Sequence, residues 1–350
     1  MANEKLKFVC DYMEGAHPAI MNELLSTNMM QTSGYGLDEF SESARDKIRK
    51  ACGAPNAGVY LLVGGTQTNA TVIDALLRSY QGVLCAETGH IAVHEAGAIE
   101  STGHKVITLP TTNGKITAQQ VQDYVEWHRN DESTEHIVQP GMVYISHPTE
   151  GGTLYTKAEL TALYDTCRRY GLPLFIDGAR LGYGLMAEES DMTLPEIARL
   201  CDVFYIGGTK VGALFGEAVV IMNENLKKDF RFIMKQRGGR MAKGRLLGVQ
   251  FDTLFTDDLY FKISRHAIEM AHQIRDIFVS AGYPLLFDSP TNQQYPIMSD
   301  AELAILGKSF GYEYWERVDE THSGVRFCAS WATTQENVDA LRAAVHALKK

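Results

Sequence analysis

Two side chains of reactive type follow apolar stretches of the sequence, at points where loops begin. Asp177 closes the stretch PLFID, and Lys210 follows FYIGGT. A carboxylate at the end of a buried strand is costly unless a cation or several donors accompany it. A lysine from which solvent is partly excluded has a lowered pKa and can form an imine with an aldehyde. Simpler interpretations exist, because Asp177 could pair with Arg180 or cap a helix and Lys210 could be a solvated loop residue.

A third candidate is the segment VGGTQTNATV, residues 63–72. Glycines that leave a strand and a Thr-Gln-Thr-Asn cluster that opens a helix present backbone N–H groups and hydroxyls, as phosphate binding requires. An ordinary helix N-cap uses the same residue types. Together with Asp177 and Lys210, the segment completes the three fixtures of a pyridoxal 5′-phosphate site. The loop would hold the phosphate, Asp177 would keep the pyridine nitrogen protonated, and Lys210 would carry the aldehyde carbon.

Strand-like and helix-like segments alternate from about residue 40 to 225, which predicts an α/β fold with a mostly parallel central sheet. Parallel strands end at one edge of a sheet, and ligands of open α/β sheets lie outside that edge, so Asp177 and Lys210 are expected to face a common crevice. The expected strands are 58–65, 83–87, 105–109, 142–147, 173–179 and 202–208, and the expected helices are 41–53, 66–82, 94–103, 116–130, 157–171 and 194–201.

The chain changes character after about residue 225. A long helix is expected from Leu246 to Ala281, followed by a mixture that indicates a small α+β domain. We therefore expect a large domain over residues 1–245, including the N-terminal segment, and a smaller one over residues 246–350. The expected strands of the smaller domain are 283–287, 295–300, 309–318 and 325–331, and its expected helices are 300–308 and 336–350.

Composition restricts the class of partner. The chain has 350 residues, 45% of them apolar and 22% charged, as in ordinary globular proteins. A net charge of −10 without a basic stripe argues against a nucleic-acid partner. The sequence contains no run of about 18 apolar residues, so we expect no membrane partner. The six cysteines are scattered singly, without metal-like spacing, so we expect reduced thiols, no metal site and a cytoplasmic protein.

Several segments together resemble a known family. IDGAR with GGTK, GTQTN, HIAVHEAGA and the late VRF are similar to the threonine aldolase group of the fold-type-I pyridoxal phosphate enzymes, also called the aromatic amino acid β-eliminating lyase/threonine aldolase family. The resemblance extends from about residue 35 to 330. It implies the aspartate aminotransferase-like fold, with Lys210 as the Schiff-base lysine and Asp177 at the ring nitrogen.

The resemblance also assigns further cofactor contacts. Gly65, Thr66 and Gln67 match the phosphate loop, Thr209 would add a hydroxyl, and His90 matches the histidine that stacks on the cofactor ring. On the residues alone, His90 would be an ordinary surface or core histidine.

Substrate contacts are implied in the same way. Arg180 and Arg326 match the arginines of the family's active site, Arg326 being the better match for the substrate carboxylate, and Tyr35 is a further substrate-binding candidate. An arginine fork fixes the plane of a carboxylate. A carboxylate held in the plane of the cofactor ring is not lost, because the bond at Cα that breaks is the one perpendicular to the ring. Cleavage of the Cα–Cβ or Cα–H bond is then left. Thr149 stands where other members have a histidine near the substrate hydroxyl.

The expected activity is that of a carbon–carbon lyase that cleaves L-threonine or L-allo-threonine to glycine and an aldehyde. Candidate bases for the hydroxyl proton are His90, a water near Thr149 and Glu150, or the cofactor phosphate. The family implies a homo-oligomer, a dimer or tetramer with sites at the interface. Arg240 or Lys243 would then contact a neighbouring subunit's phosphate, unless both belong to a solvated basic loop.

Three alternatives stay open. The chain could be another pyridoxal phosphate enzyme, such as a β-eliminating lyase or an aminotransferase. It could bind the cofactor without catalysis. It could also be an unrelated nucleotide-binding α/β protein that uses VGGTQTN as its phosphate loop, although that segment lacks the usual nucleotide-loop patterns.

Overall fold

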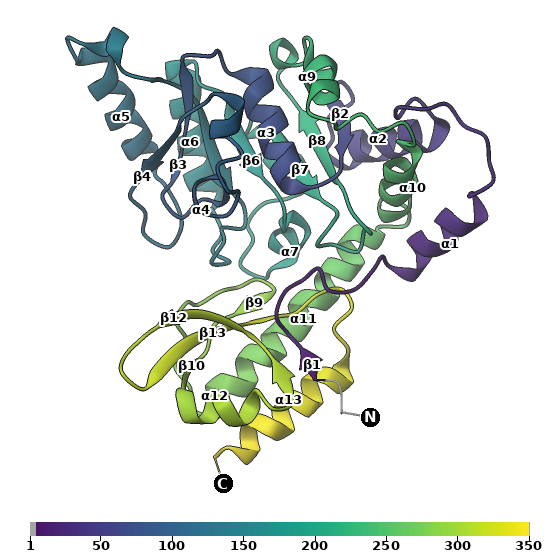
Figure 1. Cartoon of the computed structure of the whole chain (residues 1–350), viewed down its shortest axis with the longest axis vertical. Helices are drawn as coiled ribbons and strands as arrows, with labels where there is room; N and C mark the ends of the chain where they lie inside the picture. The colour runs from purple at the N-terminus through teal and green to yellow at the C-terminus, as the bar shows by residue number, and fades with distance from the viewer. Residues whose placement is uncertain (1–4, 350) are drawn as a thin grey trace.

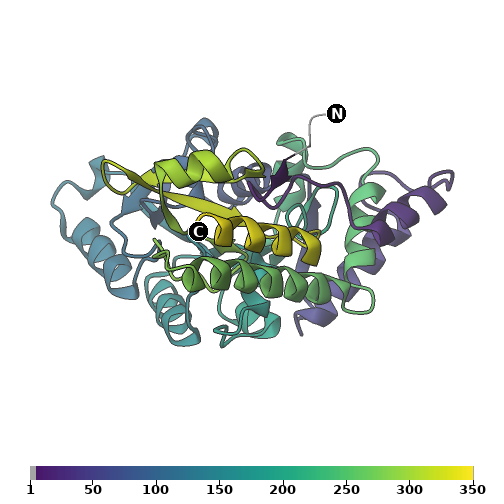
Figure 2. The same cartoon turned by 90° about the horizontal axis from the view of Figure 1, so that it is seen from below.

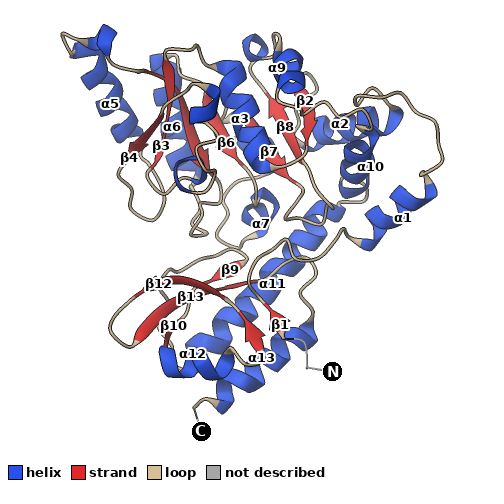
Figure 3. Cartoon of the chain, in the orientation of Figure 1, coloured by secondary structure: helices blue, strands red, loops and turns tan. Residues whose placement is uncertain are grey.

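The computed structural model describes residues 5–349, and its centre is a seven-stranded sheet (Figures 1 and 3). Its strands are β2 (Gly58–Leu62), β3 (Gln81–Ala86), β4 (Val106–Leu109), β5 (Gln139–Ser146), β6 (Leu174–Asp177), β7 (Val203–Gly207) and β8 (Glu217–Ile221). Their order across the sheet is β2-β8-β7-β6-β5-β3-β4. The five neighbouring strands β4, β3, β5, β6 and β7 pair in parallel. Strand β8 is antiparallel to both of its neighbours, β2 and β7. The mostly parallel sheet is thus confirmed, with β8 as a strand that the sequence analysis did not predict.

Helices cover both faces of this sheet. The helices of this larger part are α1 (Pro18–Ser26), α2 (Glu39–Ala51), α3 (Gly65–Leu76), α5 (Ala118–Asn130), α6 (Lys157–Tyr170), α7 (Leu181–Met186), α8 (Leu194–Arg199), α9 (Phe230–Gln236) and α10 (Arg245–Leu254), with the 3-10 turns η2 (Thr134–His136) and η3 (Glu224–Leu226). Leu174 and Ile176 of β6 belong to the core shared with α2, α5, α6, α8 and α10. Phe175, which points to the other face, belongs to the core shared with α3 and α9. Alternate residues of β6 are therefore both apolar, as expected for a strand buried on two sides.

Capping residues set the starts of several helices. Asp38, which is buried, accepts a hydrogen bond from the backbone N–H of Ser41 at the start of α2. Thr156 and Glu159 form a reciprocal capping box at the start of α6. Gly64 precedes α3 and offers no side chain, so the first turn of α3 is open to a ligand.

Two predicted helices differ from the structure. The segment 94–103 was expected to be one helix. In the structure, the short helix α4 (His90–Val93) ends just before this segment, and only the 3-10 turn η1 (Glu100–Thr102) lies within it. Ala96 and Gly97 have positive φ angles of 50° and 73°, which no right-handed helix contains. The segment 246–281 is likewise two helices, α10 and α11 (Leu259–Ser280), because Asp257 and Asp258 turn the chain with positive φ.

The smaller part of the molecule lies below the sheet in Figure 1. Its elements are β1 (Leu6–Lys7), β9 (Gln293–Gln294), β10 (Ile297–Ser299), α12 (Asp300–Leu306), β11 (Phe310–Gly311), β12 (Glu313–Arg317), β13 (His322–Cys328) and α13 (Gln335–Ala347). Strand β13 pairs antiparallel with β9, β10 and β12, and α13 lies beside α11 (Figure 2). Residues 283–287, expected as a strand, instead contribute one isolated bridge between Leu285 and Pro296.

The packing bears on where the two parts divide. We expected the division at residues 245 and 246, but α10 packs against α1 and α2 and belongs to the core of the larger part. Strand β1, near the start of the chain, pairs with β11 of the smaller part. The two-domain description stays a prediction, and this packing favours a division within α11. Residues 1–4 and residue 350 of the expected domains lie outside the described residues.

Candidate active site

Backbone packing brings the ends of β6 and β7 together. A Cβ atom on Gly178 would lie 2.0 Å from the carbonyl oxygen of Tyr205, and a Cβ on Gly207 would lie 2.2 Å from the carbonyl oxygen of Ala179. Neither position has room for any other residue type. The glycines after Asp177 and before Lys210 therefore let the two strand ends approach, which places both side chains at one edge of the sheet.

A cavity of about 360 Å³ opens at this edge. It contains eight of the residues proposed from the sequence: Gly65, Thr66, His90, Thr149, Asp177, Arg180, Thr209 and Lys210. Tyr12, Glu150, Tyr205 and Glu217 are among the other residues that line it. Within residues 5–349, no group of three or more His, Cys, Asp or Glu side chains is arranged to hold a metal ion.

Asp177 is buried and accepts hydrogen bonds from four donors. Its Oδ2 accepts from the Tyr144 hydroxyl at 2.6 Å and from Nδ2 of Asn69 at 3.0 Å. Its Oδ1 accepts from the hydroxyl of Tyr205 and from the backbone N–H of Ala179. Burial opposes ionisation, but His90 and these donors outweigh burial and lower the pKa of Asp177. The group at the end of β6 is therefore an anion at neutral pH.

Lys210 presents its amine to the same cavity. The Tyr183 hydroxyl holds the backbone by donating to the carbonyl oxygen of Lys210 at 2.6 Å. The amine itself has no hydrogen bond or ion pair to any described residue. Burial, followed by the charge of Arg180, lowers the pKa of the amine, although Asp11 and Asp177 oppose the shift. A larger fraction of the amine is therefore neutral, and so nucleophilic, than in a solvated lysine.

His90 is held by a buried carboxylate that the sequence did not reveal. The Nδ1 of His90 lies 2.7 Å from Oε1 of Glu95. Asn69 donates to the same oxygen at 2.7 Å and thereby joins Glu95 to Asp177. Burial lowers the pKa of His90, but the hydrogen bond to Glu95 and the charge of Asp177 outweigh it and raise the pKa. The histidine is thus oriented and made more basic, as in a histidine–carboxylate pair.

The N-terminus of α3 forms another wall of the cavity. The first intrahelical bond runs from the Thr68 N–H to the carbonyl of Gly64, so the N–H groups of residues 65–67 have no acceptor within the helix. A Cβ at Gly64 would have no neighbour within 4 Å, which shows that this end faces open space. Free N–H groups at the positive end of a helix dipole suit an anion such as phosphate.

The chain is similar to known proteins over nearly its whole length. A model of the family described as beta-eliminating lyase matches residues 8–347. The chain belongs to the beta-eliminating lyase family. A low specificity L-threonine aldolase from a Pseudomonas species is 30% identical over 99% of this chain and 99% of its own length. The solved structure of Leishmania major threonine aldolase has a TM-score of 0.96 and 40% identity, and covers 99% of this chain and 100% of that one.

A more distant likeness concerns the fold alone. Aspartate aminotransferase from Thermus thermophilus superimposes with a TM-score of 0.68 at 14% identity, over 99% of this chain and 91% of that one. The chain thus has the aspartate aminotransferase-like fold, fold type I, as the resemblance implied.

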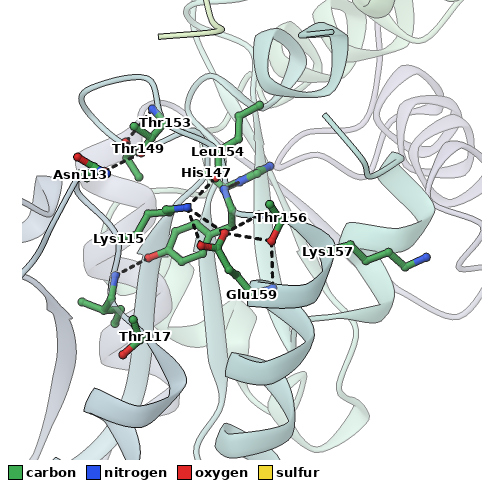
Figure 4. Close-up of polar contacts among 12 residues, drawn as sticks. Asn113, Lys115, Thr117, His147, Thr149, Thr153, Leu154, Thr156, Lys157 and Glu159 are labelled. Atoms are coloured by element: carbon green, nitrogen blue, oxygen red, sulfur yellow. Dashed lines mark hydrogen bonds and ion pairs between the residues drawn. The ribbon is translucent and has the colours of Figure 1, made fainter. Parts of the chain in front are cut away.

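In this family member, the loop after β5 carries Thr149 and is clamped from outside the cavity (Figure 4). The hydroxyls of Thr149 and Thr153 lie 2.7 Å apart, and Thr153 donates to the carbonyl of Asn113 at 2.7 Å. Lys115 donates to the carbonyl of Leu154 at 3.2 Å and pairs with Glu159 at 2.7 Å. The hydroxyl of Thr149 therefore helps to hold the loop, and the loop places the neighbouring Glu150 in the cavity.

Glu150 connects this loop to His90. Its Oε1 accepts from the backbone N–H of His90 at 2.8 Å and from the hydroxyl of Ser146 at 2.6 Å. Burial raises the pKa of Glu150. A carboxyl group that can hold a proton thus lies beside the predicted histidine.

Three of the residues proposed from the sequence do not line the cavity. Gln67 accepts from the N–H of Val63 and donates to the carbonyl of Arg237, away from the free N–H groups of α3. Arg326 donates to Gln293 Oε1 at 3.0 Å and to the carbonyl of Val9 at 2.9 Å. Their ligand contacts stay predictions.

Tyr35 lies in a different cavity, between α2 and the loop before α10, with Lys235 4.6 Å from its ring centroid. The predicted contact between Tyr35 and substrate stays a prediction.

Arg180 lines the cavity but is already paired. Its Nε and Nη2 donate to Asp11 at 2.6 and 3.0 Å, and Asp11 also accepts from Asn292 at 2.9 Å. Asp11 is fully buried. Two donor groups of Arg180 are thus committed to Asp11, and its role toward a substrate carboxylate stays a prediction.

Sequence analysis missed most of the residues that hold the predicted ones. They are Asp11, Asn69, Glu95, Tyr144, Tyr205 and Glu217. Some had a usable signal: Tyr144 and Tyr205 are polar-tipped residues within otherwise apolar strands. A buried hydroxyl needs a partner, and the carboxylate at the end of β6 was the obvious one.

Proposed function

We propose that this chain is a pyridoxal 5′-phosphate-dependent carbon–carbon lyase that cleaves L-threonine or L-allo-threonine to glycine and acetaldehyde. The observation that carries the proposal is the single cavity in which the Lys210 amine, the Asp177 carboxylate and the free N–H groups of α3 meet. Relatives named threonine aldolase at 30% and 40% identity support the choice of reaction.

The residues present fit the cofactor. Gly65 and Thr66 would hold its phosphate through the N-terminus of α3, and Thr209 lines the same cavity. Asp177 would keep a ring nitrogen protonated, and because four donors already occupy its oxygens, a ring N–H would replace one of them. When bound, pyridoxal 5′-phosphate supplies an electron-withdrawing ring that weakens the bonds at the substrate Cα.

The remaining steps belong to side chains of the cavity. Lys210 offers the amine that bonds to an aldehyde carbon. His90, made basic by Glu95, would take the proton from the substrate hydroxyl, and a positioned base of this kind is worth roughly 10²–10⁴ in rate. Glu150, whose pKa burial raises, accepts the backbone N–H of His90 and lines the same cavity. The substrate carboxylate would go to Arg326 or Arg180.

The decisive experiment combines product analysis with lysine mapping. Purified protein with added pyridoxal 5′-phosphate is incubated with L-threonine and with L-allo-threonine, and acetaldehyde and glycine are measured. Borohydride reduction followed by peptide mapping should place the cofactor on Lys210, and Lys210→Ala should lose both label and activity. A matched control is Lys243→Ala, which should keep the label on Lys210.

Two results would contradict the proposal. A label on any other lysine would remove the site. Turnover of tyrosine, tryptophan or an amino acid–keto acid pair without acetaldehyde from threonine would make the chain a β-eliminating lyase or an aminotransferase instead.

We also propose a cytoplasmic homo-oligomer, a dimer or tetramer whose sites lie at an interface. Two observations support this. All six cysteines are buried and unpaired, as in a reducing compartment. Tyr35, Arg240 and Lys243 lie outside the cavity of their own chain, where a neighbouring copy could use them. In the described part of the chain, no helix combines the length and apolar character needed to cross a membrane. Light scattering of the purified protein would test the oligomeric state.

A further inference from the structure

A buried amide of α3 joins two carboxyl groups of the site, and the reaction above gives it no task. The side chain of Asn69 is fully buried. Its Nδ2 donates to Oε1 of Glu95 at 2.7 Å and to Oδ2 of Asp177 at 3.0 Å. Both carboxyl groups are thus held close to one nitrogen atom, where burial and their mutual repulsion disfavour two anions. A neutral amide group has two hydrogens and can donate one to each.

Asp177 does not depend on Asn69 for its charge. It keeps three other donors when the amide is removed. They are the hydroxyls of Tyr144 and Tyr205 and the backbone N–H of Ala179.

Glu95 depends on Asn69 much more strongly. Within residues 5–349 the carboxyl group of Glu95 has two hydrogen-bond partners, Asn69 and the ring of His90, and both contact Oε1. Its Oε2 is buried and has no hydrogen bond to any described residue. Without the amide, Glu95 would therefore be the carboxyl group that takes up a proton, because a buried anion with fewer donors is less stable.

The charge of Glu95 decides which nitrogen of the His90 ring carries hydrogen. A carboxylate can only accept, so beside an anionic Glu95 the hydrogen lies on Nδ1 and Nε2 keeps its lone pair. The ring lines the cavity, and no described residue forms a hydrogen bond to Nε2. A protonated Glu95 would instead donate to Nδ1. The ring hydrogen would then lie on Nε2, and the ring would have no free lone pair with which to take a proton.

Other titratable groups around this pair do not replace Asn69. Burial lowers the pKa of His90, whereas the hydrogen bond to Glu95 opposes burial and raises it. The charge of Asp177 also raises this pKa, and the charge of Lys210 lowers it. The neighbouring ring of His94, whose own pKa burial lowers, is neutral at neutral pH. In the described chain none of these groups, nor Glu150 beside the His90 backbone, donates a hydrogen bond to Glu95.

We propose that Asn69 is a positioning residue that keeps Glu95 an anion beside Asp177 and thereby leaves Nε2 of His90 free to accept the proton of the substrate hydroxyl. The inference rests on the proposed function, because that function makes His90 the base. In the step, the O–H bond of the substrate breaks, its electron pair stays on the oxygen, and an N–H bond forms at Nε2. The ring becomes a cation, and the anion of Glu95 lies beside it.

The test follows Nε2 of His90 by nitrogen NMR in the full chain, without added cofactor or substrate. In the wild type, Nε2 should lose its proton as the ring cation titrates, and the neutral ring should keep its hydrogen on Nδ1. In Asn69→Leu, the pH at which Nε2 loses its proton should be about one unit higher. The reason is that a hydrogen bond which stabilises the Glu95 anion is gone, so the pair holds its proton to higher pH.

The pH dependence of threonine cleavage gives a second readout, with pyridoxal 5′-phosphate added. The kcat/KM of Asn69→Leu should be about tenfold below that of the wild type at pH values below the Nε2 midpoint. It should return toward the wild-type value at higher pH. A side chain needed only for folding would lower kcat/KM at every pH.

The matched control is Thr71→Val. Thr71 lies on the same helix and is equally buried, and its hydroxyl has no hydrogen bond to any described residue. The substitution should leave both the Nε2 midpoint and the pH profile unchanged.

Two results would overturn the inference. One is a wild-type ring that carries its hydrogen on Nε2 at high pH, a result that needs no variant to fold. The other is an Nε2 midpoint that is the same in Asn69→Leu and in the wild type. Threonine cleavage with an unchanged midpoint would reject the role of Asn69 alone. A raised midpoint in a protein that does not cleave threonine would reject the proposed substrate and keep the link from Asn69 to His90.

Discussion

At the scale of single residues, the site is organised by buried carboxylates whose protonation differs according to their donors. Asp177 has four donors and a lowered pKa. Glu217 accepts one backbone N–H bond, and its pKa is raised to about 8. At Asp177 the charge of His90, together with the hydrogen bonds, outweighs burial, whereas at Glu217 burial outweighs the opposing influence of Thr209 and Lys210. The same logic applies to His90, whose basicity depends on Glu95.

Replacing Glu95 by Gln should lower the pKa of His90. The variant keeps a hydrogen-bonding side chain but removes the anion, so burial, which lowers the pKa of His90, is then opposed by less charge. We expect a downward shift of about one unit or more, because an adjacent opposite charge moves a pKa by about 1–3 units. An NMR titration of the His90 ring measures it directly.

The control for this change is Glu100→Gln, in the exposed 3-10 turn of the same segment. It should leave the His90 titration in place. If Glu95→Gln left the pKa of His90 unchanged, the carboxylate would be a structural partner only.

At the scale of elements, the loop from β5 to α6 carries three cavity residues and is held by contacts from residues 113–115. Thr153 is the joint, because its hydroxyl links Thr149 to the Asn113 carbonyl. The position of the loop residues that face the cavity therefore depends on the contacts that hold the opposite side of the loop.

Replacing Thr153 by Val should weaken catalysis without unfolding the protein. Valine keeps the branched shape and loses both hydrogen bonds, each worth about 1 kcal/mol. One such loss at the transition state corresponds to roughly a fivefold fall in kcat/KM for threonine cleavage. Steady-state kinetics test this, with Thr161→Val as control, because its hydroxyl bonds only within α6 to the Lys157 carbonyl. An unchanged kcat/KM in Thr153→Val would show that the loop keeps its place without this joint.

Local patterns predicted the elements that carry the main site residues, and contacts between distant residues escaped prediction. The strands that end in Asp177 and before Lys210 could be read from apolar runs that stop at glycines, and their parallel pairing followed from the intervening helices. Strand β8 was missed because its short run EAVVI begins with a charged residue, Glu217, which suggests an exposed position. In the structure Glu217 is buried and lines the cavity. The Asp11–Arg180 pair spans 169 positions, and no local pattern records such a partner.

At the scale of the whole molecule, the N-terminal segment ties the two parts together. Strand β1 joins the smaller part through β11, and Asp11 then binds Arg180, just beyond the end of β6, and Asn292 of the smaller part. The site therefore depends on residues from three separate regions of the chain, and disturbing this junction should affect both stability and the cavity.

Replacing Asp11 by Asn should destabilise the fold by about 3–5 kcal/mol, because it leaves the guanidinium of Arg180 buried without its anion. Urea denaturation measures the change. The control is Asp276→Asn, which removes an exposed partner of Arg275 and should cost less than about 1 kcal/mol. A loss of similar size in both variants would contradict the importance of the buried pair.

The same pair predicts a pH dependence. Burial opposes ionisation of Asp11, but Arg180 outweighs burial and lowers the pKa of Asp11 below its ordinary value of 3.8. A lowered carboxyl pKa stabilises the fold fully above the ordinary value, and this contribution is lost as the pH falls. The difference in unfolding free energy between wild type and Asp11→Asn should thus be constant near neutral pH and narrow below pH 3.8.

The turn between β7 and β8 has a further consequence for motion. The N–H groups of Gly208 and Thr209 both donate to the Gly216 carbonyl, and Thr209 Oγ1 accepts the N–H of Gly216. These three hydrogen bonds hold the two ends of the turn together. The main chain beneath Lys210 is thereby anchored from both flanks. Any displacement of the amine during a turnover must then come from torsions of its own side chain, without a rearrangement of the main chain beneath it.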